Sequence, residues 1–178
     1  AVSSGGVQII SSGGKASNTV ISSGGSQVIN DGGSAVSAAV SSGGVQIISS
    51  GGKASNTVIS SGGAQVINDG GSAVSAAVSS GGFQIVSSGG KASNTVISSG
   101  GVVSVTSGGS ATNINQSSGA AIVVDTGAGL VSGSRYDGVI FEISSGSASN
   151  VLLENGGQLS VLSGHSAIST MVSSGGKV

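Results

Sequence analysis

The fold of this chain is decided by the stretch Ser3–Val40, which reads SSGGVQIISSGGKASNTVISSGGSQVINDGGSAVSAAV. The stretch recurs at Ser41–Val78 with one change, since Ala64 stands where the first copy has Ser26, and it begins a third time at Ser79. Each 38-residue unit consists of two 19-residue halves with the same spacing of glycine pairs. Self-similarity at a short fixed period is typical of solenoids and other repeat arrays, in which each unit packs on its neighbours.

Short strands are predicted between the glycine pairs. Six 19-residue units follow one another from Ser3 to Gln116, and β-branched runs such as VQII, NTVI and QVI lie between their glycine pairs. No helical period is present, and a glycine pair at least every 11 residues would break a helix. Strands of about 4–5 residues bounded by glycine turns account for the pattern. Nineteen residues fit one coil of two or three such strands.

The sequence therefore predicts an all-β fold, a right-handed parallel β-helix (β-solenoid) of about nine 19-residue coils. Residues 1–178 are expected to form a single β-helix fragment, with regular repeats over 1–116 and degenerate repeats over 117–178. In the degenerate part, Arg135–Leu153 fits the template at full length. Ala1 and Val2 match the end of a preceding repeat, so we expect the sequence to be a piece of a longer array.

Stacking of the coils predicts columns of like residues about 4.8 Å apart. One column is expected to form an amide ladder along the axis, and its members are Gln8, Gln27, Gln46, Gln65 and Gln84. Adjacent apolar pairs such as Ile9–Ile10 supply most of the core, but the pattern leaves open which member of each pair points inward. Lysines such as Lys15 alternate with serines in successive coils, and each of Asp31 and Asp69 is expected near a lysine of a neighbouring coil. Recent duplication of a 38-residue unit explains the same alternation equally well.

Composition excludes several classes of function. The formal net charge is −1, and the five Lys and Arg residues form no basic patch, which excludes nucleic-acid binding. The absence of cysteine excludes disulfides and thiolate metal sites. The glycine pairs match neither a phosphate-binding loop nor a calcium-binding solenoid repeat, so no cofactor and no metal site are expected.

Catalytic residues are sparse. The only carboxylates that could converge on one face are Asp125, Asp137 and Glu142, with Arg135 nearby in sequence, and they would suit a glycan-processing β-helix enzyme. A solvated face of a less regular region is the simpler interpretation. His165 replaces a turn glycine and is expected to be an exposed turn residue. The chain is therefore expected not to be an enzyme.

Serine pairs before glycine pairs are the most frequent motif. Serine suits the start of a turn and glycine supplies a left-handed conformation, so a structural role explains each site. A column of hydroxyl groups at exposed turns is also an array of acceptors for O-linked modification.

The residues Ser41–Ile59, SSGGVQIISSGGKASNTVI, resemble the passenger repeats of the self-associating autotransporter adhesins of enterobacteria, the AIDA and TibA type. The resemblance is close over about Ser3–Gln116 and loose over Ser117–Val178. It implies a β-helix passenger displayed on the bacterial cell surface or secreted, exported through the family's C-terminal outer-membrane β-barrel, which is absent from this chain. It further implies autoaggregation between passengers, biofilm formation and adherence to the host cell surface, properties linked to virulence.

The resemblance also implies O-heptosylation of serines by a dedicated cytoplasmic heptosyltransferase. Carried over by position, the acceptors are the serines of the SSGG motifs, namely Ser3, Ser4, Ser11, Ser12, Ser22, Ser23, Ser41, Ser42, Ser49, Ser50, Ser60, Ser61, Ser79, Ser80, Ser87, Ser88, Ser98 and Ser99. The serines of the ASNT motifs, Ser17, Ser55 and Ser93, are second choices. A glycan-processing enzyme and an inert structural spacer are the alternatives to this glycoprotein adhesin.

Overall fold

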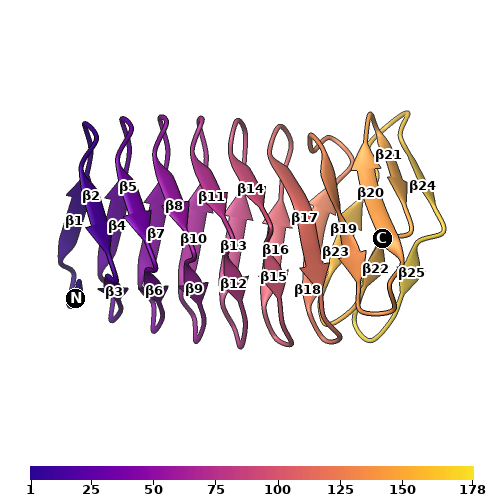
Figure 1. Ribbon diagram of the computed structural model, residues 1–178. Coiled ribbons are helices and arrows are strands. Elements are labelled where there is room, and N and C mark those ends of the chain that lie inside the picture. Colours follow the sequence, from indigo (N-terminus) through magenta and orange to yellow (C-terminus); the bar gives the residue numbers. More distant parts are fainter.

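A computed structural model describes residues 1–178 as a parallel β-solenoid in which every regular element is a strand (Figure 1). A typical coil contains three strands of four, three and two residues, as in β1 (Val7–Ile10), β2 (Lys15–Ser17) and β3 (Val20–Ile21). Successive coils lie side by side along a rod, with the N-terminus at one end (Figure 1). The predicted β-solenoid of about nine coils is confirmed. No helix long and apolar enough to cross a membrane is present.

The first strands of the coils, six of which have four residues, stack into an eight-stranded sheet along one side of the rod. In order, this sheet contains β1, β4 (Ser26–Ile29), β7 (Val45–Ile48), β10 (Ala64–Ile67), β13 (Phe83–Val86), β16 (Val102–Val105), β18 (Ala121–Asp125) and β23 (Gln158–Ser160). Like residues of neighbouring coils lie beside each other, as Gln27 does beside Gln46. In the regular coils, residues that pair across neighbouring strands are therefore 19 positions apart in the sequence.

A second, fifteen-stranded sheet contains the second and third strands of the regular coils in two columns. One column contains β2, β5 (Ser34–Val36), β8 (Lys53–Ser55), β11 (Ser72–Val74) and β14 (Lys91–Ser93), and the other contains β3, β6 (Ala39–Val40), β9 (Val58–Ile59), β12 (Ala77–Val78) and β15 (Val96–Ile97). The seven-residue strand β17 (Ser110–Gln116) pairs with both β14 and β15 and so joins the columns.

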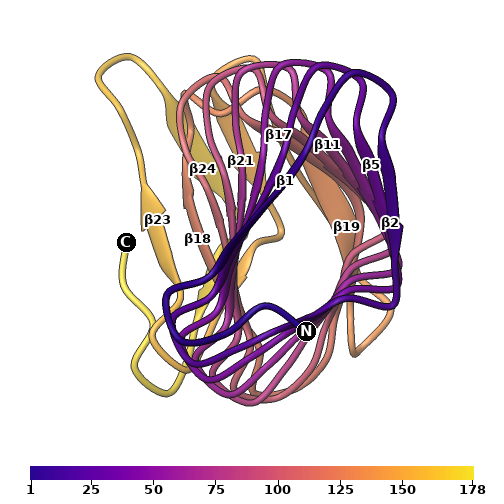
Figure 2. The ribbon, with the colours of Figure 1, turned by 90° about the vertical axis from the view of Figure 1, so that its left-hand side faces the viewer.

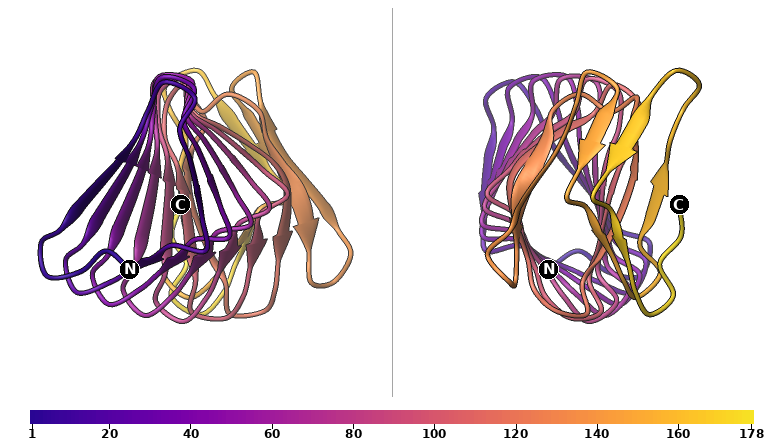
Figure 3. Two further views of the ribbon diagram at one scale, coloured as in Figure 1. Left: turned by 60° about the vertical axis from the view of Figure 1, so that its left-hand side comes forward. Right: turned by 90° about the vertical axis from the view of Figure 1, so that its right-hand side faces the viewer.

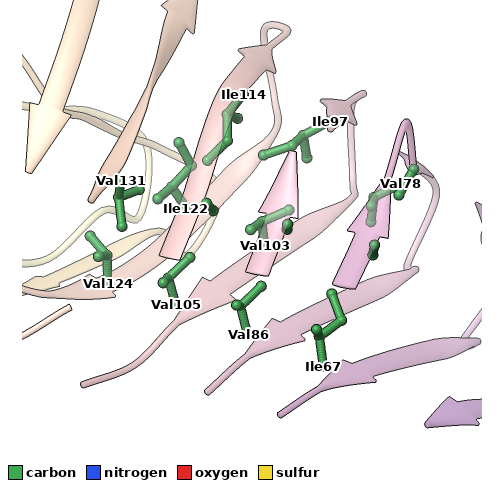
Figure 4. Close-up of a cluster of buried hydrophobic side chains, with 14 of the residues drawn as sticks. Ile67, Val78, Val86, Ile97, Val103, Val105, Ile114, Ile122, Val124 and Val131 are labelled. Carbon is green, nitrogen blue, oxygen red and sulfur yellow. The ribbon is translucent and has the colours of Figure 1, made fainter. Parts of the chain in front are cut away.

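The core is filled from all three strands of each coil. Ile29 and Ile48, the fourth residues of their strands, are fully buried, whereas Val28 and Ile47 before them are half-buried and point outward. This settles which member of each apolar pair faces the interior. Small alanines of the second strand, such as Ala54, and the last residue of each coil complete the packing. Figure 4 shows side chains from facing strands meeting in the interior, among them Ile67, Val78, Val86, Ile97 and Val103.

A ladder of buried glutamine side chains runs along the interior, as predicted. Gln46 Nε2 donates to Gln27 Oε1 at 2.7 Å, and Gln65 Nε2 donates to Gln46 Oε1 at 2.7 Å. The threonines of alternate coils join the ladder, since Thr95 Oγ1 donates to Gln84 Oε1 at 3.0 Å. Thr57 and Thr95 are buried, so the threonine column belongs to the core and not to a surface.

The regular winding stops after β18. The strands β19 (Val131–Arg135) and β20 (Ile140–Ser144) form an antiparallel hairpin, and β21 (Ser147–Ser149) pairs antiparallel to β20. The prediction that Arg135–Leu153 follows the repeat is therefore wrong in topology: this segment adds no strand to the eight-stranded sheet, and β23 pairs directly with β18. The reason is the turn at Asp137–Gly138, a dipeptide that favours a tight hairpin between β-branched strands.

The last coil resumes parallel pairing. The strand β24 (Ser166–Ile168) pairs with β21, and β25 (Met171–Val172) pairs with β22 (Leu152–Leu153). Figures 2 and 3 show this last coil, in yellow, displaced to one side of the regular stack.

The predicted pairing of aspartates with lysines is wrong. The ion pair of this chain joins Arg135 to Asp137, and no lysine lies within ion-pair distance of an acidic residue. Asp31 occupies the tip of a turn, beyond the end of the strand column that carries the lysines, so the carboxylate and the ammonium groups are separated.

Candidate functional site

The SSGG motifs form tight turns at both edges of the eight-stranded sheet. In the first, the Gly6 N–H donates to the Ser3 carbonyl at 2.9 Å. Ser4 and Gly5 both adopt left-handed conformations, with φ of 53° and 75°. Two central residues with positive φ define a type I′ turn. Its backbone twist suits the sharp reversal between short strands.

The turns fall into two columns, which we call entry turns and exit turns. Entry turns precede the long strands and comprise Ser3–Gly6, Ser22–Gly25, Ser41–Gly44, Ser60–Gly63, Ser79–Gly82 and Ser98–Gly101. Exit turns follow the long strands and comprise Ser11–Gly14, Asn30–Gly33, Ser49–Gly52, Asn68–Gly71 and Ser87–Gly90. The entry column therefore repeats serine in every coil, whereas the exit column alternates between Ser-Ser and Asn-Asp.

The last glycine of each turn is required by the stacking of the coils. A Cβ added to Gly44 would lie 2.3 Å from the carbonyl oxygen of Ile21 in the preceding coil. No side chain fits at that distance, so the neighbouring backbones approach each other only because glycine stands there. The same close approach holds the turn tips in straight columns.

The two serines of a turn differ in exposure. Ser41 is half-buried and Ser42 is exposed, and this difference recurs in every predicted pair from Ser11–Ser12 onward. In the first turn both Ser3 and Ser4 are exposed. The second serine is therefore the residue at the tip of each turn.

The hydroxyl groups of the tip serines form no hydrogen bonds within the chain. The backbone of the tips is already paired between coils: the Ser23 N–H donates to the Ser42 carbonyl at 2.9 Å, and the Ser42 N–H donates to the Ser61 carbonyl at 2.8 Å. The serine hydroxyls that do form hydrogen bonds, those of Ser107, Ser144, Ser147, Ser149 and Ser166, all lie outside the predicted set. The eighteen predicted SSGG hydroxyls are thus free of intramolecular partners.

The tips are not all alike in conformation. The second serine has a left-handed φ in every SSGG turn of the first four coils, for example 50° at Ser42. The entry turn of the fifth coil is of the same kind, with φ of 44° at Ser80. In the later turns with Ser88 and Ser99 only the following glycine is left-handed, with φ of 75° at Gly89 and 76° at Gly100. A single positive φ at the third position is typical of a type II turn. The peptide group of these two tips is therefore turned over.

The second-choice serines lie at a different corner. Ser17, Ser55 and Ser93 end the second strand of their coils. Ser17 is exposed, while Ser55 and Ser93 are half-buried. Ser55 and Ser93 are therefore less accessible than the tips of the SSGG turns, whereas Ser17 is exposed as the tips are.

The three carboxylates predicted for an enzyme are not brought together. Asp125 lines a cavity of about 360 Å³ together with Gln158 and Lys177, and its Oδ2 accepts the Ser107 N–H at 3.0 Å. Asp137 and Glu142 do not line this cavity. Asp137 pairs with Arg135 at the β19–β20 hairpin, and Glu142 accepts the Ser144 hydroxyl at 2.7 Å.

Two residues of the irregular coils occupy places that the sequence did not indicate. Arg135 is buried, and its Nη1 donates to the Asn150 carbonyl at 3.2 Å. His165 was expected to be exposed, but it is half-buried, and its Nδ1 lies 2.8 Å from Thr126 Oγ1. The Asp-Gly dipeptide was the available signal for the hairpin that buries Arg135.

The family described as AIDA, adhesin of bacterial autotransporter system, probable stalk, matches residues 46–101 and 132–178. Among solved structures, a crystal structure of a TibC-catalysed, hyper-glycosylated fragment of TibA matches 99% of this chain and 78% of that fragment, with 32% sequence identity and a TM-score of 0.50. Comparison with curated proteins found no match.

Proposed function

The chain belongs to the AIDA family of bacterial autotransporter adhesins, and we propose that it acts there as a non-enzymatic passenger segment that is a substrate for serine O-heptosylation. As a passenger it would stand on the bacterial surface, where it associates with other passengers and contacts host cells. The glycosylation of the TibA fragment by TibC supports a transferase as the modifying partner.

One observation carries the proposal: exposed serines with unengaged hydroxyl groups stand at the tips of two columns of turns. In a glycosyl transfer, a serine Oγ bonds to the anomeric carbon of an activated heptose. The leaving group departs with its bonding electrons, and the serine proton passes to a base of the transferase. The acceptor needs only a reachable hydroxyl, which the tip serines offer without loss of any internal hydrogen bond.

The proposal assigns the tip serines first, as in Ser42, Ser50 and Ser61. The first serines of the turns, such as Ser41, are half-buried and rank second. Ser55 and Ser93 rank last, because they end strands of the fifteen-stranded sheet and are half-buried there. Sugars on the tips would project from both edges of the eight-stranded sheet.

Intact-mass measurement tests the modification directly. The full chain is co-expressed with an autotransporter heptosyltransferase, and a mass increase in steps of one heptose is expected. A variant with every tip serine replaced by alanine is expected to lose most of that increase. An unchanged mass of the wild-type chain in the presence of an active transferase would refute the substrate role.

A further inference from the structure

The outward face of the eight-stranded sheet is apolar and carries no charge. The first and third residues of each strand from β1 to β16 point outward, from Val7 and Ile9 to Val102 and Ser104. Ten of these twelve residues are apolar, and the other two are Ser26 and Ser104. Large side chains are exposed on this face, with Val7 at 63% and Phe83 at 44%.

This face differs from the β2 column of the fifteen-stranded sheet. The outward column of the fifteen-stranded sheet carries Lys15, Lys53 and Lys91 in alternate coils. Parallel sheets are usually covered on both faces, and an uncovered apolar patch of several hundred Å² on a soluble protein commonly marks a docking surface. Six strands of four residues span about 29 Å by 13 Å, or about 380 Å².

The face has relief with a 38-residue period. Along its first column the residues alternate between large and small over five coils, as Val7, Ser26, Val45, Ala64 and Phe83, and Val102 in the sixth coil is large again. Ridges therefore recur every two coils, about 9.6 Å apart, with furrows of the same spacing between them. Only a surface with the same spacing fits this relief along its whole length.

We propose that this face docks on the same face of a second copy of the chain, with the two rods antiparallel. The two-fold axis then lies between the third and fourth coils, and the inner ridges meet furrows: Val45 faces the partner's Ala64, and Phe83 faces the partner's Ser26. At the two ends of the contact Val7 faces the partner's Val102, so one large residue meets another there. Flat stacks of like side chains that interdigitate in this way form dry interfaces between sheets about 10 Å apart. The inference rests on the proposed function, because it names the surface through which passengers associate.

A second copy fits the face better than a lipid surface does. The outward positions from β1 to β16 include no lysine or arginine that would attract anionic headgroups. A fluid bilayer also has no relief to match a 9.6 Å repeat. The serine turns border the apolar strip on both edges, which gives the pair an apolar centre with a polar rim.

The area of the face predicts that two chains associate weakly and that many copies displayed together associate strongly. Two such faces bury about 760 Å² in total, below the roughly 1,200 Å² of stable specific complexes. A single pair of chains in solution is therefore expected to dissociate readily. Many copies on one particle raise the effective concentration and convert the weak contact into firm association.

Agglutination of beads coated with the full chain tests the interface. Val45→Lys places a charge in the centre of the face and is expected to slow agglutination about tenfold or more, because the charge has no partner when buried. Val74→Lys is the matched control, since Val74 is exposed at 39% on the other sheet, and it is expected to agglutinate as the wild type does. Circular dichroism checks that both variants remain folded.

Complementary charges make the test specific for the antiparallel register. Beads carrying Val45→Lys are mixed with beads carrying Ala64→Glu, and the mixture is expected to agglutinate faster than either population alone. Because the chain has no cysteine, Val45→Cys and Ala64→Cys chains provide a second measurement, a mixed disulfide dimer formed under mild oxidation in preference to either homodimer.

The outcomes separate the inference from the proposed function. If wild-type beads do not agglutinate, the self-association in the proposed function is wrong. If wild-type and folded Val45→Lys beads agglutinate equally, self-association stands but this face is not its surface. If Val45→Lys leaves agglutination unchanged but abolishes binding to vesicles or host cells, the occupant is a membrane or host surface and the inference is overturned.

Discussion

Thr57 Oγ1 donates a hydrogen bond to Gln46 Oε1 at 3.2 Å across the interior of one coil. Gln46 Oε1 also accepts Gln65 Nε2 from the next coil, so one buried oxygen ties two coils and two strands together. Where the second 19-residue half has Ala38 or Ala76 in place of threonine, the glutamine keeps only its ladder partner. The 38-residue alternation is thus present inside the rod as well as on its surface.

The glutamine ladder is expected to be a large source of stability. Gln65→Ala would leave the Gln46 acceptor and the Gln84 donor without their ladder partner, and it would open a cavity in the core. A loss of about 2–4 kcal/mol in the free energy of unfolding is expected, measured by urea denaturation. Gln158→Ala is the control, because Gln158 is exposed, and a change within about 0.5 kcal/mol is expected there. Equal effects of the two substitutions would contradict a stabilising ladder.

Neighbouring glycines of one turn are expected to differ in their tolerance of alanine. Gly44→Ala places a Cβ 2.3 Å from the Ile21 carbonyl oxygen and forces the coils apart, at about 3 kcal/mol. At Gly43→Ala the backbone is left-handed, with φ of 76°, and the added Cβ makes only an ordinary contact at 3.9 Å with the Gly24 nitrogen, so a loss of about 1 kcal/mol is expected. Thermal denaturation of the two variants measures the difference. A lower melting temperature for Gly43→Ala would show that conformation, and not the approach of the coils, limits the turn.

Arg135 and Asp137 are expected to respond unequally to substitution. The Arg135 side chain is 5% exposed and that of Asp137 is 35% exposed, so removal of the carboxylate leaves a buried guanidinium without its counter-ion. Asp137→Ala is expected to cost about 2 kcal/mol, less than a fully buried pair because Asp137 is partly solvated. Arg135→Met combined with Asp137→Ala should recover most of that loss. Additive losses in the double variant, seen by denaturation, would argue against coupling of the two side chains.

Tip serines are expected to be modified ahead of the first serines of the turns. Ser42→Ala should remove one sugar from its turn after co-expression with the transferase, because the exposed hydroxyl is the acceptor. Ser41→Ala, the matched change one residue earlier, should leave the sugar in place because Ser41 is half-buried. Mass spectrometry of proteolytic peptides reads the occupancy of each turn. The opposite result, a sugar lost only from Ser41→Ala, would place acceptor choice outside the folded geometry.

The repeat predicted the stacking of this fold almost completely. A period of 19 residues fixes which residues lie side by side, so the glutamine column and the parallel register followed from the sequence alone. The sequence did not show which side chains face the core, because Ile9 and Ile10 are adjacent and equally apolar. Which of the two is buried depends on where the turns at the corners of the coil lie. For that reason the apolar outer face of the eight-stranded sheet could not be recognised beforehand.

The irregular coils were predicted less well for a specific reason. The segment from Arg135 to Leu153 has the length of a full coil, and this agreement concealed the Asp137–Gly138 hairpin within it. Burial of Arg135 and the Thr126–His165 contact depend on that reversal and have no counterpart in the repeat. At the candidate site, the sequence identified the serine pairs but not the difference in exposure between their members, which arises from turn geometry.

Because each coil pairs with the next at an offset of 19 residues, the rod can be lengthened by whole repeats without a change in strand pairing. Ser41–Val78 differs from Ser3–Val40 at one residue, and it occupies the next two coils without disturbing any strand pairing. Insertion of a further copy would restore every ladder contact at both of its boundaries and lengthen the rod by about 9.6 Å. Recombination between near-identical gene segments can thus adjust the reach of the molecule, and the number of acceptor serines with it, without creating a new folding problem.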